Sequence, residues 1–171
     1  LYHNDSISDN DKIRIVEQIA KYSKVFISSE IPLPNELVKY KYPLGPETIH
    51  DAISFASLVF GESSTMSSEA AILGTPFVFL YPKSIDYTDS FENDYHLGFN
   101  FTGKDYNTDS ALSKACEILE EKSKTLYTER ANKFISESID VTALLFWLIT
   151  NYPQSINRLK TDPKVFDQFY N

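Results

Sequence analysis

Apolar positions in the first hundred residues predict helices that alternate with short buried strands. The earliest helix is expected within residues 9–23, where Ile13, Val16, Ile19 and Ala20 recur at helical spacing. Acidic side chains crowd the start of this segment, where the positive end of a helix dipole favours them. The chain is therefore expected to open on a helix, unless a strand precedes it within residues 1–3.

Short runs of β-branched and aromatic residues predict the strands. Proline, glycine and polar residues bound these runs, and their nearly continuous apolar character is typical of strands buried in a parallel sheet. A polar loop is expected over residues 83–95, before the last of them. The runs occupy residues 24–28, 38–42, 57–61, 76–82 and 97–103.

Two further helices are expected between these runs. Pro46 suits the first turn of one helix, whose apolar stripe extends from Ile49 to Ala56. The other helix covers residues 66–73 and ends at Gly74, a natural C-terminal cap.

The alternation of helix and strand predicts an α/β fold, with a Rossmann-like parallel sheet flanked by helices. This nucleotide-binding core is expected over residues 1–107. From residue 109 the pattern is purely helical, so a helical segment over residues 108–171 is expected to pack on the same domain. Its stretch 141–150 is apolar on most faces and should be buried or docked on a partner.

Charge and composition narrow the classes of function. A net charge of -8 over 171 residues, with sixteen scattered basic residues, disfavours nucleic-acid binding. Cys116 is the sole cysteine, which excludes an intramolecular disulfide, and its apolar helical face favours a core position. The acidic residues of loop 83–95 match no calcium-loop spacing, so no metal site is expected. No apolar run reaches the roughly 20 residues of a membrane span, and a cytoplasmic location is expected.

Three hydroxyls stand at the mouth of the helix that follows the strand run 57–61, on Ser63, Ser64 and Thr65. In open α/β sheets ligands bind at the carboxyl ends of the strands, and the N–H groups that start a helix attract phosphate. Glu69 lies about one turn, roughly 5.4 Å, beyond Thr65 on the same face, where its carboxylate suits the hydroxyls of a ribose. The spacing predicts a site for a nucleoside diphosphate. The alternative is an ordinary N-cap, with Glu69 in solvent.

The stretch GESSTMSSEAAILGTP, residues 61–76, resembles the donor-binding motif of GT-B glycosyltransferases and of the related UDP-N-acetylglucosamine 2-epimerases. In those proteins a strand ends in an acidic residue, and Ser-Gly-Gly and a helix follow that carries Glu-Ala and closes with Leu-Gly-x-Pro. Here Ser-Thr replaces Gly-Gly, which leaves the sugar undetermined. Residues 24–101 are also similar to an uncharacterised GT-B-like family of bacterial and archaeal proteins, known only as a domain of unknown function.

This resemblance implies roles for particular residues. The hydroxyl run Ser63, Ser64 and Thr65 would hold the diphosphate of a UDP- or CDP-type nucleotide sugar, which is a substrate and not a cofactor. Glu69 would hold the ribose. The base would lie near the loop formed by Tyr42, Pro43 and Leu44.

His50 and His96 are further candidates for contact with the sugar or the phosphates, with a helix-surface or capping role as the alternative for His50. The resemblance also implies that the chain is the C-terminal half of a two-domain enzyme. It would then need a missing N-terminal domain and catalyse nothing alone, so its catalytic residues are not assigned. Two other interpretations stay open: part of a sugar-nucleotide epimerase, or a non-catalytic anion-binding or scaffold domain that docks through residues 141–150.

Overall fold

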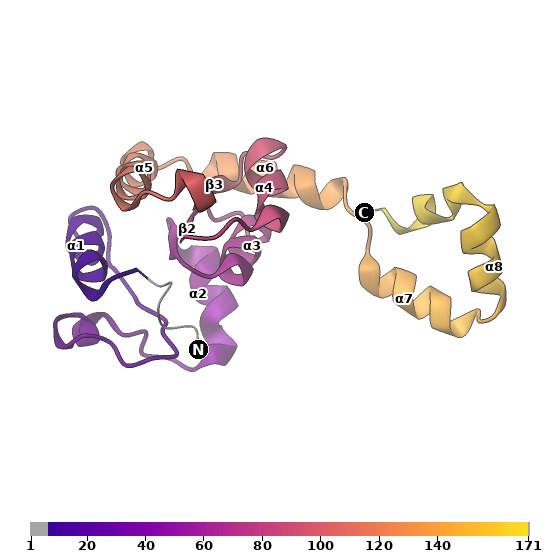
Figure 1. Cartoon of the computed structure of the whole chain (residues 1–171). Coiled ribbons are helices and arrows are strands. Elements are labelled where there is room, and N and C mark those ends of the chain that lie inside the picture. The colour runs from indigo at the N-terminus through magenta and orange to yellow at the C-terminus, as the bar shows by residue number, and fades with distance from the viewer. Residues whose placement is uncertain (1–6, 171) are drawn as a thin grey trace. The chain divides into compact units, whose positions relative to one another are not determined.

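A computed structural model describes residues 7–170 of the chain (Figure 1). The chain divides into two compact units, Leu1–Ala131 and Asn132–Asn171, so the expected boundary between residues 107 and 108 falls inside the first unit. The strand considered for residues 1–3 lies outside the described residues. Helices, 3₁₀ helices (η) and strands follow one another in this order up to the end of α6: α1 (Asp9–Ile19), η1 (Asn35–Tyr40), η2 (Pro46–Thr48), α2 (Ile49–Phe55), β1 (Val59–Gly61), α3 (Ser64–Ile72), β2 (Phe77–Tyr81), η3 (Asp86–Thr88), α4 (Asp89–Asn93), β3 (Gly98–Thr102), η4 (Gly103–Asp105), α5 (Thr108–Glu121) and α6 (Lys124–Ser136).

The first unit is an α/β structure with a three-stranded parallel sheet in the order β1-β2-β3. Phe77 of β2 pairs with Val59 of β1 and with Gly98 of β3, so the three strands begin at the same level. β2 and β3 continue to pair beyond the end of β1, as far as Tyr81 and Thr102. The expected parallel sheet flanked by helices is thus confirmed for these three strands.

Two of the expected strands do not form. Residues 24–28 contribute one bridge, between Ile27 and Lys41, and the first three residues of the run 38–42 belong to the 3₁₀ helix η1. The intervening segment contains Pro32 and Pro34, which lack the N–H group that a strand ladder needs. Phe26 is also half-exposed, so this segment lacks the two-sided burial of a central parallel strand. The expected loop 83–95 likewise contains η3 and α4.

The core lies on both faces of β2. Val78 and Leu80 are completely buried and pack against α1 and α5, in a cluster that includes Ile15 and Ala115. Cys116 is partly buried and packs against the same cluster. Figure 1 places α1 and α5 on one side of β2 and α3 on the other. Because successive strand side chains point to opposite faces, the equally buried Phe77 and Phe79 serve the α3 side.

Helix α3 is short and lies close to the sheet. Its inward side chains are small, because Ser67, Ala70 and Ala71 are the residues that it buries. Gly74 ends the helix with φ 72°, a left-handed conformation that favours glycine. A Cβ atom at Gly74 would lie 2.9 Å from the backbone of Thr128, so close packing requires glycine there as well. The predicted cap at Gly74 is confirmed.

The second unit consists of the end of α6, α7 (Val141–Thr150), α8 (Gln154–Thr161) and the 3₁₀ helix η5 (Pro163–Phe169). The ring of Trp147 lies 5.6 Å from that of Phe169, and the Arg158 guanidinium lies 5.7 Å from the Trp147 ring. Within the described residues, none of these helices nor those of the first unit is both long and apolar enough for a membrane crossing.

Candidate functional site

The hydroxyl run lies where the sequence predicted it, at the start of α3 and directly after β1. Ser63 is the N-cap of α3, and its Oγ accepts a hydrogen bond from the backbone N–H of Met66 at 3.3 Å. Ser63 and Thr65 are exposed, and Ser64 is half-buried. The mouth of α3 therefore opens at the carboxyl edge of the parallel sheet, the edge at which open α/β folds bind ligands. Ser63 serves as an N-cap in any case, so its position alone does not distinguish a diphosphate site from an ordinary helix cap.

Tyr87 of η3 contacts the mouth of α3. Its O–H donates a hydrogen bond to Ser64 Oγ, although the Tyr87 residue as a whole is 56% exposed. An exposed ring held by one hydrogen bond is a weak cover, because such a bond contributes only about 0.5–1.5 kcal/mol. Because Ser64 Oγ accepts this bond on a lone pair, the Ser64 O–H remains free to donate to a ligand.

Glu69 faces His50 across two neighbouring helices. The His50 Nε2 atom, in the first turn of α2, lies 3.4 Å from Glu69 Oε2, with side-chain exposures of 62% and 33%. Solvent reaches both groups, so the pair contributes little stability. The Glu69 carboxylate is thus neither buried in the core nor fully surrounded by solvent.

Glu62, the acid next to the hydroxyl run, is held by another part of the chain. Its carboxylate accepts a hydrogen bond from the backbone N–H of Ile7, just before α1. Burial raises the pKa of Glu62, and the bond from Ile7 and the charge of Lys12 oppose this shift in part. The carboxylate that would repel an anion beside Ser63 is therefore committed to a different contact.

The loop expected to hold a base is tied to the start of α2. The Tyr42 hydroxyl lies 2.8 Å from Thr48 Oγ1, and the Tyr42 ring packs edge-on against Phe26 at 6.1 Å. Thr48 stands two residues before His50 in the chain. Pro43 and Leu44 are exposed beside Tyr42. The loop and the His50–Glu69 pair are thus linked through the first turn of α2.

His96 lies apart from these residues. It has a left-handed backbone, φ 53°, and its Nδ1 atom lies 2.9 Å from the carbonyl oxygen of Glu92. Its own carbonyl accepts a hydrogen bond from Arg130. Because His96 precedes β3, it lies at the edge where the strands begin, opposite to the mouth of α3. The structure brings His50 to Glu69, but it does not bring His96 to that group.

A cavity of about 780 Å³ lies beside the carboxyl end of β3. Its charged lining is mostly acidic. In the part of the chain that the structure describes, the one basic lining residue is Lys104, and the acidic ones are Asp86, Asp89, Glu92 and Asp105. The pKa of Glu92 is raised by burial, and the carboxylate accepts a hydrogen bond from the Asn100 backbone N–H at 2.9 Å. Such a lining disfavours a diphosphate. Across the described residues, no three acidic, histidine or cysteine side chains gather in a way that would hold a metal ion.

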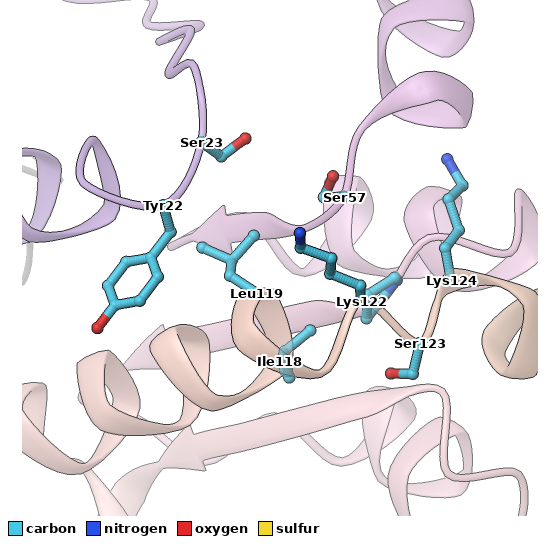
Figure 2. Close-up of a pocket in the computed structure, with 9 residues that line it drawn as sticks. Tyr22, Ser23, Ser57, Ile118, Leu119, Lys122, Ser123 and Lys124 are labelled. Carbon is cyan, nitrogen blue, oxygen red and sulfur yellow. The ribbon is translucent and has the colours of Figure 1, made fainter.

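A smaller cavity of about 260 Å³ lies at the edge of the sheet where the strands begin. It lies between the end of α1, the loop before β1 and the junction of α5 and α6. Figure 2 shows the Lys122 side chain extending toward Ser57 across it. The Lys124 ammonium points to the end of α2, where it donates hydrogen bonds to the carbonyls of Ser54 and Ala56. Burial lowers the pKa of Lys124.

Sequence reasoning missed the contact of Tyr87 with the hydroxyl run. Tyr87 lies 23 residues from Ser64, in a segment with no helical or strand periodicity, so no spacing pointed to it. It also missed the paired position of His50, which was considered for ligand contact but not as a partner of Glu69.

Comparisons with known proteins add no assignment. The chain matches no known protein family, no curated protein and no solved structure. The class that its described residues define is an α/β domain with a parallel sheet and a serine-rich helix mouth at the carboxyl edge.

Proposed function

We propose that this chain binds the nucleotide part of a nucleotide sugar at the mouth of α3, as the donor-binding part of a GT-B-type glycosyltransferase. One observation carries the proposal: Ser63, Ser64 and Thr65 open α3 at the carboxyl edge of the sheet, and Glu69 lies one turn further on, partly exposed. The resemblance of residues 61–76 to the donor-binding motif supports the same role.

Each part of the site has a chemical task in this proposal. The first backbone N–H groups of α3 and the three hydroxyls donate hydrogen bonds to the diphosphate, and the positive helix end stabilises its charge. Glu69 accepts hydrogen bonds from the ribose hydroxyls, and His50 orients its carboxylate. The base lies against the loop of Tyr42, Pro43 and Leu44, which is anchored at Thr48.

In glycosyl transfer from such a donor, the bond between the sugar and the diphosphate breaks and the diphosphate leaves with the bonding electron pair. The donors at the mouth of α3 would stabilise that leaving charge, because they are fixed in place before the reaction. The acceptor and the base that deprotonates it would come from the second domain that the resemblance implies. The isolated chain is therefore proposed to bind a nucleotide without turnover.

Calorimetric titration of the chain with UDP, CDP, GDP and ADP tests the proposal. Selective binding of one nucleotide is expected, with an affinity that falls about tenfold or more in Ser64→Ala and in Glu69→Ala, because each loses a hydrogen bond to a charged or charge-bearing partner. Ser113→Ala is the matched control, since it removes a serine hydroxyl from an exposed position of another helix, α5. Equal affinity of all three variants, or no binding of any nucleotide, would reject the proposed site.

A further inference from the structure

The second unit has an apolar surface along α7. Its large side chains with the greatest exposure are Val141, Leu145, Phe146 and Ile149, which are 53% to 76% exposed. At 100° per residue these four lie within less than half of the helix circumference. Leu144 and Trp147 point to the other side and are half-buried. No residue of α7 is fully buried, although it is the most apolar helix of the described chain.

This unit is small for a self-sufficient core. It spans forty residues, Asn132–Asn171, and among those described only Val165 and Phe169 are buried large apolar side chains. Chains near this length usually need a disulfide, a metal or oligomerisation for stability. Cys116 is the only cysteine and belongs to the other unit, and no metal-binding group occurs among the described residues. Of these three sources of stability, oligomerisation is the one that the described residues leave open.

The charges of the second unit favour association of two copies. The whole chain carries a net charge of -8, which opposes self-association. The second unit contributes none of it, because four basic and four acidic side chains balance one another. No charged residue occurs between Asp140 and Arg158, so two α7 surfaces meet without like charges. The eight charged residues are Lys133, Glu137, Asp140, Arg158, Lys160, Asp162, Lys164 and Asp167.

The exposed apolar area is close to the lower limit for a stable dimer. The four α7 side chains and the neighbouring Tyr152, which is 72% exposed, present on the order of 600 Å² together, since an aromatic side chain buries about 150–250 Å² and the three aliphatic ones are smaller. Monomers rarely expose a patch above about 300–600 Å². Two such patches approach the roughly 1,200 Å² at which stable interfaces begin.

We propose that the α7 surface, defined by Val141, Leu145, Phe146, Ile149 and Tyr152, is a homodimer interface. Two copies of the chain pair through it about a two-fold axis, so that each patch meets itself. The interface buries the apolar face of α7 and completes the core that the second unit lacks. This inference does not depend on the nucleotide site.

Sedimentation equilibrium of the full chain over a wide concentration range tests the proposal. A monomer–dimer equilibrium is expected for the wild type. Leu145→Glu and Ile149→Lys should each weaken it by about tenfold or more, because a charge would be buried at the centre of the interface.

Ala143→Glu is the matched control for Leu145→Glu. It adds the same charge to the same helix, outside the apolar stripe, at a position near the N-terminus of α7 where an acid is favourable. This variant should dimerise like the wild type. Circular dichroism of each variant separates loss of pairing from loss of fold. A wild-type chain that stays monomeric at every concentration, or an equal effect of Ala143→Glu and Leu145→Glu, would overturn the inference.

Discussion

His50 Nε2 lies 3.4 Å from Glu69 Oε2, and this contact joins the first turn of α2 to the helix that carries the hydroxyl run. In the proposed site, Glu69 binds the ribose and His50 only orients it. His50→Ala should therefore reduce nucleotide affinity by no more than about fivefold, the range of an exposed ion pair. Glu69→Ala should cost about tenfold or more, because it removes charge-assisted hydrogen bonds.

The double variant distinguishes orientation from direct contact. If His50 acts through Glu69, His50→Ala adds no further loss to Glu69→Ala in calorimetric titration. His96→Ala is the control, because His96 lies at the opposite edge of the sheet and should leave the affinity unchanged. A larger loss in His50→Ala than in Glu69→Ala would instead make the histidine the ligand-binding group.

The contact between Tyr87 and Ser64 gives a smaller effect of the same sign. Tyr87→Phe removes the O–H that donates to Ser64 Oγ and retains the ring. In the proposed site the Ser64 O–H donates to the diphosphate, and without Tyr87 it is no longer held in one orientation, so nucleotide affinity should fall between about twofold and tenfold. Calorimetric titration with the preferred nucleotide measures this change, and a rise in affinity would show that the Tyr87 hydroxyl competes with the ligand.

Glu62 gives a prediction about pH. Burial raises its pKa in the folded chain above the ordinary value of 4.5, so its stabilising contribution is complete below that value and is lost as the pH rises through the folded pKa. Glu62→Gln keeps an oxygen that accepts from Ile7 but cannot ionise. Glu62→Gln should therefore be more stable relative to the wild type at pH 7 than at pH 4. The difference in the free energy of unfolding should be less than about 1 kcal/mol, because Glu62 is only half-buried.

Urea unfolding of both proteins at the two pH values measures this difference. The exposed Glu47→Gln provides a charge-matched control for the loss of one negative charge from an acidic chain. A Glu62→Gln protein that loses stability relative to the wild type as the pH rises would contradict the assigned direction of the pKa shift.

The sequence predicted those elements whose local signals agree with their burial. β1, β2 and β3 follow apolar runs bounded by glycine or proline, and α3 ends at Gly74 because that position requires a left-handed backbone. The runs 24–28 and 38–42 carried similar side chains but no neighbouring strand within the described residues, so their propensity produced a single bridge. Strand propensity thus predicted the wrong state where tertiary pairing was missing.

The candidate site, too, was predicted from the sequence only in part. The position of the hydroxyl run followed from the order of strand and helix, which sequence periodicity reveals. The contacts of Ser64 with Tyr87, of Glu62 with Ile7 and of Glu69 with His50 depend on how separate segments pack. Sequence spacing holds no information about such long-range contacts, and only the folded structure supplied them.

Lys122 offers a test of backbone strain at the end of α5. It caps this helix with φ 49° and ψ 38°, a left-handed conformation that costs a residue with a Cβ atom about 1–2 kcal/mol. Lys122→Gly removes this cost. Glycine also raises the entropy of the unfolded chain, which lowers the stability by about 0.4–1 kcal/mol. The free energy of unfolding should rise by up to about 1 kcal/mol, with an unchanged denaturant slope in urea titration.

Lys122→Ala separates the backbone effect from the loss of the ammonium group. Alanine retains the Cβ atom and its strain but loses the side chain that extends toward Ser57 in Figure 2, so it should be no more stable than the wild type. If Lys122→Gly were instead as destabilising as Lys122→Ala, the lysine side chain would contribute more than the strain costs. The most direct physical cause would then be its favourable interaction with the C-terminal end of the α5 dipole, worth about 0.3–1 kcal/mol.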